Sequence, residues 1–313
     1  MGKRVFHACQ GVAIDGNPLA GVQNLSVRTS NDTHVVDNFG SLDIAGVYAD
    51  NPTSTITLSR VINASADIRY PTNSELHEVL PSITTNGKYL CLFIGDDTKD
   101  IAGNTAGTSI KYNNIVYNRY TYNFVVDGNF TEDIEIISNE KIIGNNDCDI
   151  TSMESLPTGS GIDLARRQMF SSSYNLGEKF PASGNLQTLT IDIPFNIQTV
   201  QEFGKPISDN TKKYRYATMP VEITVEATIQ YTPSNSNDEY DNYGFSSSGV
   251  SCNSGGNLPT TDSLSFGFCS GINFQIDNCI LNSVNYDGGG TDGSYVQFTY
   301  SYSCYNQFKI ASS

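Results

Sequence analysis

The sequence contains no tryptophan, and only three histidines and four methionines among its 313 residues. Cations are also scarce: 18 Lys and Arg stand against 33 Asp and Glu, so the formal net charge is −15. Such an acidic chain repels phosphate, which argues against specific binding to nucleic acid. No segment approaches the roughly 18 apolar residues of a membrane helix, and the first residues lack the apolar core of a signal peptide. We therefore expect no membrane anchor.

Motifs of catalysis and of cofactor binding are also missing. No GxSxG, P-loop or GxGxxG precedes a predicted helix. His7, His34 and His77 lack the spacing of metal ligands, and the glycine-rich segment around Asp287 and Asp292 is more simply a turn than a calcium site. We predict no enzyme activity, no metal and no cofactor. The seven cysteines are interpreted as buried free thiols, with a disulfide in the C-terminal half as the alternative.

What the sequence does have is strand and turn formers, including 18 Tyr, 15 Phe and 27 Gly. This composition favours short strands joined by many turns. Strict alternation of apolar and polar residues predicts strands at 54–61 and 221–229, each with one dry and one wet face. The other predicted strands are 88–94 and the arms of two long hairpins, 115–127 with 130–138 and 272–286 with 294–305. We expect a mainly β protein.

A repeat relates the two halves of the chain. Residues 22–40 align without gaps with residues 186–204, at an offset of 164, and a second block aligns Tyr48 to Pro52 with Tyr216 to Pro220. We predict two tandem domains, 1–157 and 158–313, with short helices at 74–80, stopped by Pro81, and at 161–170, and with a long surface loop at 233–256. The residues expected to form the structural core of the repeat are Leu25, Val27, Phe39, Gly40 and Pro52 in the first copy, and Leu189, Ile191, Phe203, Gly204 and Pro220 in the second.

The order of these motifs resembles the tail tube proteins, also called major tail proteins, of bacteriophages. The motifs are Gly21-Val-Gln-Asn-Leu-Ser-Val, Val35-Val-Asp-Asn-Phe-Gly, Pro52 before an alternating strand, and a hairpin over 123–132 that turns through Asp-Gly into Thr-Glu. The resemblance covers most of the first half. The second half matches in its early strands, but it lacks Thr-Glu and ends in a segment rich in cysteine and glycine.

The resemblance implies two tail-tube-like β-barrel or sandwich domains, each with a side helix. Their hairpins would join those of neighbouring subunits in one barrel around a lumen. Two domains per chain imply a trimeric ring of pseudo-sixfold symmetry, with a hexamer as the alternative. The residues expected to line the lumen are Thr55, Thr57, Ser59, Asp192, Glu222, Thr224 and Glu226. Arg28, at the repeat position of Asp192, would add positive charge there.

The same resemblance implies a structural function in the tail of a virion that is assembled in the host cytoplasm. Stacked rings would conduct double-stranded DNA during ejection, through transient and non-specific contact. The implied partners are further copies of the chain, tape-measure, terminator and baseplate proteins, and a sheath where the tail has one. Three alternatives stay open: a baseplate hub, a tail terminator, and a β-rich virion adhesion module.

Overall fold

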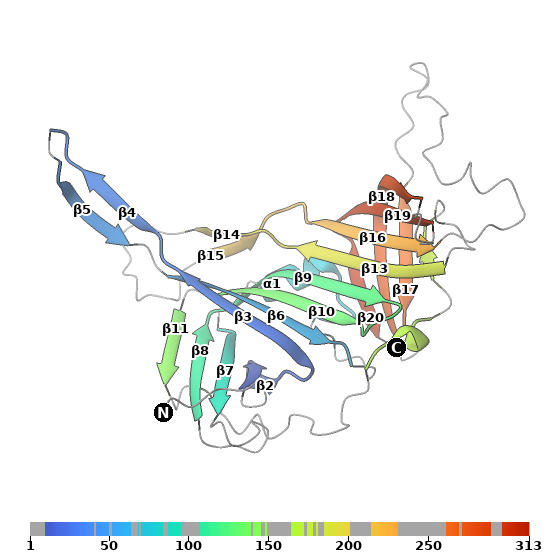
Figure 1. Cartoon of the computed structure of the whole chain (residues 1–313), viewed down its shortest axis with the longest axis horizontal. Helices are drawn as coiled ribbons and strands as arrows, with labels where there is room; N and C mark the ends of the chain where they lie inside the picture. The colour runs from blue at the N-terminus through green and yellow to red at the C-terminus, as the bar shows by residue number, and fades with distance from the viewer. Residues whose placement is uncertain are drawn as a thin grey trace, which may run out of the picture.

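The computed structural model describes residues 10–40, 42–49, 52–63, 68, 70–83, 87–95, 107–138, 140–144, 148, 164–171, 174–177, 180, 185–200, 214–230, 261–268, 271–288 and 296–312. These residues form a mainly β protein with antiparallel sheets, one short α-helix and one 3-10 turn (Figure 1). The predicted β class is therefore confirmed. The sheets are open, and the described residues form no closed barrel.

An eleven-stranded sheet runs through both halves of the chain. Eight of its strands lie side by side in the order β3-β6-β10-β9-β13-β16-β19-β18, and every neighbouring pair is antiparallel. Their bounds are β3 Val22–Ser30, β6 Thr53–Val61, β10 Thr131–Ser138, β9 Val116–Val125, β13 Asn185–Pro194, β16 Glu222–Gln230, β19 Gln297–Tyr305 and β18 Ile272–Asp287. The first part of β18 also pairs with β17 and β20, and β17 pairs with β12. These strands are β17 Asp262–Gly267, β20 Phe308–Ser312 and β12 Asn175–Leu176.

A five-stranded sheet lies beside the first half of the large sheet, in the order β11-β8-β7-β1-β2 (Figure 1). The strands are β11 Glu140–Gly144, β8 Gly107–Asn113, β7 Tyr89–Gly95, β1 Gln10–Ile14 and β2 Asn17–Pro18. The helix α1, Leu76–Ile83, buries Leu76 and Val79 in the same core. Buried side chains of both sheets and of the helix form one continuous hydrophobic cluster.

Alternation explains how the large sheet acquires its dry face. In β16, Ile223, Val225 and Ala227 are buried, while the residues between them are exposed or half-buried. In β6, Ile56 and Leu58 are buried in the same way. Because side chains alternate between the faces of a strand, every second residue enters the core, and its burial stabilises the fold by about 1.5–3 kcal/mol for each large apolar side chain.

Strand order and register recur along the large sheet. The first set of strands, in the spatial order β3-β6-β10-β9, is followed by the second set, β13-β16-β19-β18. In both sets the strand that comes fourth along the chain, β10 or β19, lies between the second and the third strands in the sheet. Arg28 of β3 pairs with Thr55 of β6, and Asp192 of β13 pairs with Thr224 of β16. Arg28 and Asp192 are 164 residues apart, which is the offset of the sequence repeat.

Two backbone irregularities recur at the same offset. A β-bulge in β9 leaves Asn118 without a residue directly opposite on β10. A β-bulge in β18 leaves Asn282 without a residue directly opposite on β19. Asn114, between β8 and β9, and Asn278, within β18, both have positive φ angles, of 50° and 55°. Asparagine tolerates this left-handed conformation better than most residues. Each pair is separated by 164 residues.

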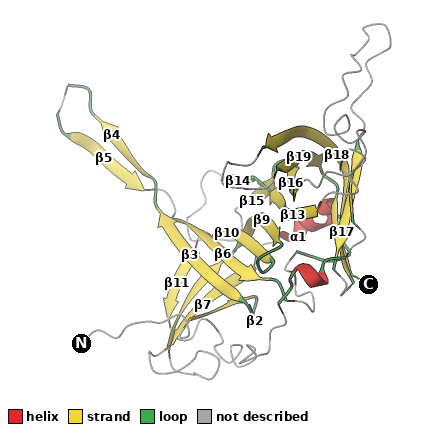
Figure 2. Ribbon diagram, turned by 45° about the vertical axis from the view of Figure 1, so that its right-hand side comes forward, coloured by secondary structure: helices red, strands yellow, loops and turns green. Residues whose placement is uncertain are grey.

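Two hairpins extend beyond the sheets. The first is made of β4, Thr33–Asp37, and β5, Ile44–Ala49, and it projects from the end of β3 and β6 away from the body (Figures 1 and 2). The second is made of β14, Ile197–Val200, and β15, Tyr214–Ala217. His34 pairs with Tyr48 in the first, and Gln198 pairs with Tyr216 in the second.

The predicted strands are confirmed, with bounds within a few residues. The helix prediction is wrong at one end, because α1 continues through Pro81 to Ile83. Proline removes one hydrogen-bond donor but keeps a φ angle compatible with a helix. Within the predicted helix at 161–170, the described residues contain only the 3-10 turn Arg167–Met169. The loop at 233–256 and residues 289–293 of the predicted glycine-rich turn at 287–293 lie outside the described residues.

Cysteine pairing corrects the expectation of free thiols and confirms the alternative, a disulfide in the C-terminal half. Cys279 of β18 lies opposite Cys304 of β19 and forms a disulfide with it. Cys91 of β7 forms a second disulfide with Cys148, 57 residues along the chain. Both pairs are made by the fold rather than by local spacing, so the sequence showed no motif for them. The remaining cysteines, Cys9, Cys252 and Cys269, lie outside the described residues.

The shared positions of the repeat do not all lie in the core. Leu189 and Ile191 are fully buried, and Leu25 and Val27 are half-buried against the core. Phe39 was expected in the core, but it is fully exposed because it lies near the tip of the projecting hairpin. The remaining shared positions are Gly40, Pro52 and Pro220, which are exposed, and Phe203 and Gly204, which lie outside the described residues.

Candidate functional site

The face of the large sheet opposite the core is polar across all eight strands. The registers place hydroxyl, amide and charged side chains next to one another from β3 to β18, and these side chains are half-buried or exposed, except for buried Ser303. One row across the sheet runs through Ser26, Thr57, Glu135 and Arg119, and another through Asn123, Thr190, Glu226, Ser301 and Ser283. We call this surface the polar face.

The seven residues predicted to line a lumen all lie on the polar face. They come from three strands: Thr55, Thr57 and Ser59 from β6, Asp192 from β13, and Glu222, Thr224 and Glu226 from β16. Arg28 of β3 lies on the same face, directly opposite Thr55, and it is exposed. The structure thus brings the predicted residues of both halves onto one continuous surface.

The polar face carries an excess of negative charge. Its described residues include six carboxylates and two guanidinium groups, a difference of four negative charges. The carboxylates are Asp133, Glu135, Asp192, Glu222, Glu226 and Asp287, and the cations are Arg28 and Arg119. Such a surface repels the phosphates of nucleic acid rather than binding them.

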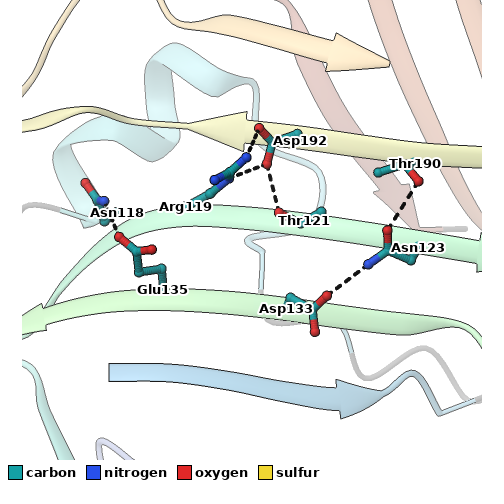
Figure 3. Close-up of polar contacts among 8 residues, drawn as sticks. All are labelled: Asn118, Arg119, Thr121, Asn123, Asp133, Glu135, Thr190 and Asp192. Atoms are coloured by element: carbon teal, nitrogen blue, oxygen red, sulfur yellow. Dashed lines mark hydrogen bonds and ion pairs between the residues drawn. The ribbon is translucent and has the colours of Figure 1, made fainter. Parts of the chain in front are cut away.

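The two sets of strands meet at β9 and β13, where polar side chains link neighbouring strands (Figure 3). Arg119 donates two hydrogen bonds to the carboxylate of Asp192, at 2.5 and 2.7 Å, and Thr121 donates a third, at 2.8 Å. The hydrogen bonds to Asp192 raise the pKa of Arg119. We call this pair of strands, which joins the first set to the second, the internal seam.

A second group of contacts extends from the internal seam into the first set. The amide of Asn123 accepts a hydrogen bond from Thr190 at 3.2 Å and donates one to Asp133 at 2.9 Å (Figure 3). At the bulge, the amide nitrogen of Asn118 donates to Glu135 at 2.5 Å. These bonds hold polar side chains in place on three adjacent strands, so the polar face at the internal seam is ordered.

Several residues of this face were not identified from the sequence. Arg119, Thr121 and Asn123 alternate with the buried aromatic residues Tyr120 and Tyr122 in β9. The sequence predicted this segment as a strand, and its period-two pattern already contained the signal for a wet face. Whether that wet face joined the wet face of β13 depended on a pairing between the halves, which alternation cannot show.

Both ends of the eight-strand array are unpaired within the described residues. β3 pairs with β6 on one side, and no described strand lies along its other edge. Residues 280–287 of β18 pair with β19 on one side, and no described strand pairs with their other edge. A strand edge presents a row of backbone donors and acceptors that can pair with another chain. We call these the β3 edge and the β18 edge.

The comparisons with known proteins identify no family: no protein-family model and no curated protein matches this sequence. Among the described residues, no three His, Cys, Asp or Glu side chains gather closely enough to hold a metal ion. In that same part of the chain, no helix has the length and apolar character needed to cross a membrane.

Proposed function

We propose that this chain is the tube subunit of a bacteriophage tail, built from two tandem tail-tube-like domains. The single observation that carries the proposal is the continuous eight-strand array, in which one strand order occurs twice and a polar face runs across both sets. In this proposal each set, with the strands that cover its dry face, belongs to one copy of a duplicated domain. The order of sequence motifs that resembles tail tube proteins supports the same reading.

The two free edges support assembly into a ring. Within the described residues the array ends in two unpaired edges, which leave backbone hydrogen bonds unmade, and closing the array with further copies pairs both edges. Eight is an even number of antiparallel strands, so β18 and β3 run in opposite directions and can meet as an antiparallel pair. Three chains then contribute about 24 strands and six sets to one barrel. A barrel of this size encloses an open channel, since 16–18 strands already leave one.

The chemistry of the polar face fits a channel for DNA. The dry face must point outwards because it is covered by other strands and by α1, so the polar face lines the channel. Its hydroxyl groups and excess of carboxylates offer little that holds a phosphate backbone. In this role Thr55, Thr57, Ser59, Asp192, Glu222, Thr224 and Glu226 contact the passing duplex transiently and without sequence specificity.

The projecting hairpin suits contact between successive rings. In a closed barrel the hydrogen bonds run around the ring and the strands run obliquely along its axis. The β4–β5 hairpin extends β3 and β6 beyond the edge of the sheet, where the next ring would lie (Figure 2). Seven of its large apolar side chains are exposed, namely Val35, Val36, Phe39, Leu42, Ile44, Val47 and Tyr48. The partner of this surface is a second copy of the chain, and tape-measure, terminator and baseplate proteins complete the tail.

Electron microscopy of the purified protein tests the proposal. We expect rings, or tubes of stacked rings, with a channel of roughly 40 Å, as barrel scaling gives, and a ring mass of three chains. A protein that stays monomeric at every concentration and salt condition would refute a tube subunit. Single rings that never stack would favour a tail terminator. A ring of six chains would contradict the proposal that three chains, with two sets of strands each, close the barrel.

A further inference from the structure

The internal seam shows how one set of strands joins the next. β9 and β13 pair antiparallel, with Asn123 opposite Thr190 and Thr121 opposite Asp192. Arg119 lies diagonally across from Asp192 and binds it with two hydrogen bonds. The cation therefore comes from β9, which ends the first set in spatial order, and the carboxylate comes from β13, which begins the second set.

The matching registers give each residue of the internal seam a counterpart at the free edges. β3 corresponds to β13, and the second part of β18 corresponds to β9, both at an offset of 164. Transferring the observed pairing to these strands places Asn285 opposite Arg28. The same register places Ser283 opposite Ser30, and Asp287 opposite Ser26.

Charge at the free edges is reversed relative to the internal seam. The β3 edge carries the cation Arg28 where β13 carries Asp192. The β18 edge carries Asp287 where β9 carries Asn123, and it has no counterpart of Arg119, whose position is taken by Ser283. In the transferred register Asp287 lies diagonally across from Arg28, a separation that a long side chain can span.

We infer that the β18 edge pairs with the β3 edge of a second copy of this chain, in the register that places Asn285 opposite Arg28, and that charge selects this head-to-tail pairing. The inference rests on the proposed function, because it supplies the contact that closes the ring. It also commits to one partner, since each edge is complementary in charge and in strand direction to the other.

The same charges oppose two-fold pairing of like edges. Two β3 edges paired about a two-fold axis near Arg28 would bring this cation close to its own copy, and two β18 edges paired about an axis near Asp287 would do the same for that carboxylate. Like charges on neighbouring positions of a strand pair are destabilising. A head-to-tail contact repeats around a closed ring, whereas a contact between like edges ends at a dimer. Charge reversal between the seams thus directs assembly towards rings.

Exchanging the charges of Arg28 and Asp287 tests whether charge directs the pairing of the β18 edge with the β3 edge. Arg28→Asp places a carboxylate near Asp287, and Asp287→Arg places a second cation near Arg28. We expect each single variant to raise the protein concentration needed for assembly by about tenfold or more, and the double variant to recover assembly to within about threefold of the original chain. A double variant as defective as the singles would overturn the role of charge.

Asp277→Arg is the matched control for Asp287→Arg. It makes the same change of charge on the same strand, at an exposed residue in the part of β18 flanked by β17 and β20. We expect its assembly to match that of the original chain. A loss of assembly as large as that of Asp287→Arg would show a general effect of charge on the strand and would overturn the inference.

Cysteine cross-linking tests the register. Ser283→Cys combined with Ser30→Cys should give disulfide-linked trimers. Ser283→Cys combined with Ser26→Cys should not, because four residues along a strand separate the thiols by about 13 Å, beyond the reach of a disulfide. Rings that cross-link only through Ser26→Cys would overturn the register and leave the tube function standing. Cross-linked linear oligomers without a channel would support the pairing of the β18 edge with the β3 edge and refute the tube function.

Discussion

At the scale of single residues, the core contains an ion pair that only the first set of strands possesses. Arg60 of β6 donates to Glu132 of β10 at 2.6 Å, with side chains 1% and 0% exposed, and Tyr122 donates to the same carboxylate at 3.0 Å. The residues at the corresponding positions of the second set are Ile229 and Phe298, which pair directly and are both buried. One structural position is therefore occupied by a charged pair in one set and by an apolar pair in the other.

This comparison predicts the effect of removing the pair. Arg60→Met leaves a buried carboxylate without its cation and should lower the free energy of unfolding by about 3–5 kcal/mol. Arg60→Met combined with Glu132→Leu and Tyr122→Phe replaces both charges and the tyrosine hydroxyl that binds Glu132, so it should recover most of that loss, as an apolar replacement of a buried pair often does. Denaturant unfolding of both variants provides the measurement. A triple variant no more stable than the single one would contradict the prediction.

Buried tyrosines predict how stability depends on pH. Burial raises the pKa values of Tyr120 and Tyr122 well above the ordinary 10, and the nearby carboxylate of Glu132 raises them further. Their contribution is complete below pH 10 and is lost as the pH rises from 10 towards the folded pKa values, because only the unfolded chain ionises there. Above pH 10 each tyrosine should lower the free energy of unfolding by about 1.4 kcal/mol per pH unit.

Alkaline titration followed by tyrosinate absorbance and circular dichroism checks this expectation. The buried tyrosines should ionise only when the fold is lost, so a step in tyrosinate absorbance should coincide with the loss of the β signal in circular dichroism. Tyr120→Phe should shift the unfolding transition to higher pH. Gradual ionisation of all tyrosines near pH 10 with the β signal unchanged would show that the two residues are not protected from solvent.

At the scale of elements, the β4–β5 hairpin is the main exception to the rule that apolar residues enter the core. Phe39 and Leu42 are fully exposed at its end. Exposed apolar surface of this extent on one projecting element marks a contact surface. In the corresponding β14–β15 hairpin the structure describes fewer residues, and Tyr216 is among those that are exposed.

Removing apolar surface from this hairpin should affect stacking but not folding. We expect Phe39→Ser combined with Leu42→Ser to leave the free energy of unfolding within about 0.5 kcal/mol of the original, since neither side chain is buried. Rings should still close, and tubes should become short or absent in electron micrographs. Ile143→Ser, at an exposed apolar residue of β11, is the control. Tubes of normal length in the double variant would remove the hairpin from the contact between rings.

At the scale of the whole molecule, the polar face gives the proposed tube its defining property. A channel that conducts DNA must not hold it, and affinity for DNA rises with the number of phosphates that cations neutralise. Glu222→Lys combined with Glu226→Lys reverses two charges on β16, a total of four charge units in each chain. Assembled tubes of this variant should bind short duplex DNA at least about tenfold more tightly than the original tubes at low salt.

Binding of labelled duplex to tubes, measured across salt concentrations, tests this prediction. The affinity of the variant should fall steeply with salt, as counterion release requires. Asp277→Lys combined with Glu75→Lys makes the same change of charge at exposed residues that belong to none of the strand pairs of the eight-strand array. If this control bound DNA as tightly as the β16 variant, net charge alone would explain the effect and the channel position of Glu222 and Glu226 would be refuted.

Local patterns in the sequence determined the strands. Alternation in β6 and β16 identified both their length and their wet faces, because the two-residue period of a strand is a property of the backbone itself. The two long hairpins were found in the same way, from alternating runs joined by turn residues. The offset of 164 was also visible in the sequence, and it later proved to relate strands, bulges and left-handed asparagines.

Only the tertiary structure decided which strands are neighbours. The pairing of β9 with β13, the Arg119–Asp192 contact and the two disulfides join residues that are distant in the chain, and alternation is compatible with many such pairings. The fold also placed Phe39 outside the core, since an apolar residue is buried only where another element covers it. The sequence by itself therefore determined the two faces of each strand, and the fold decided that these faces form one surface, with two edges that no described strand covers.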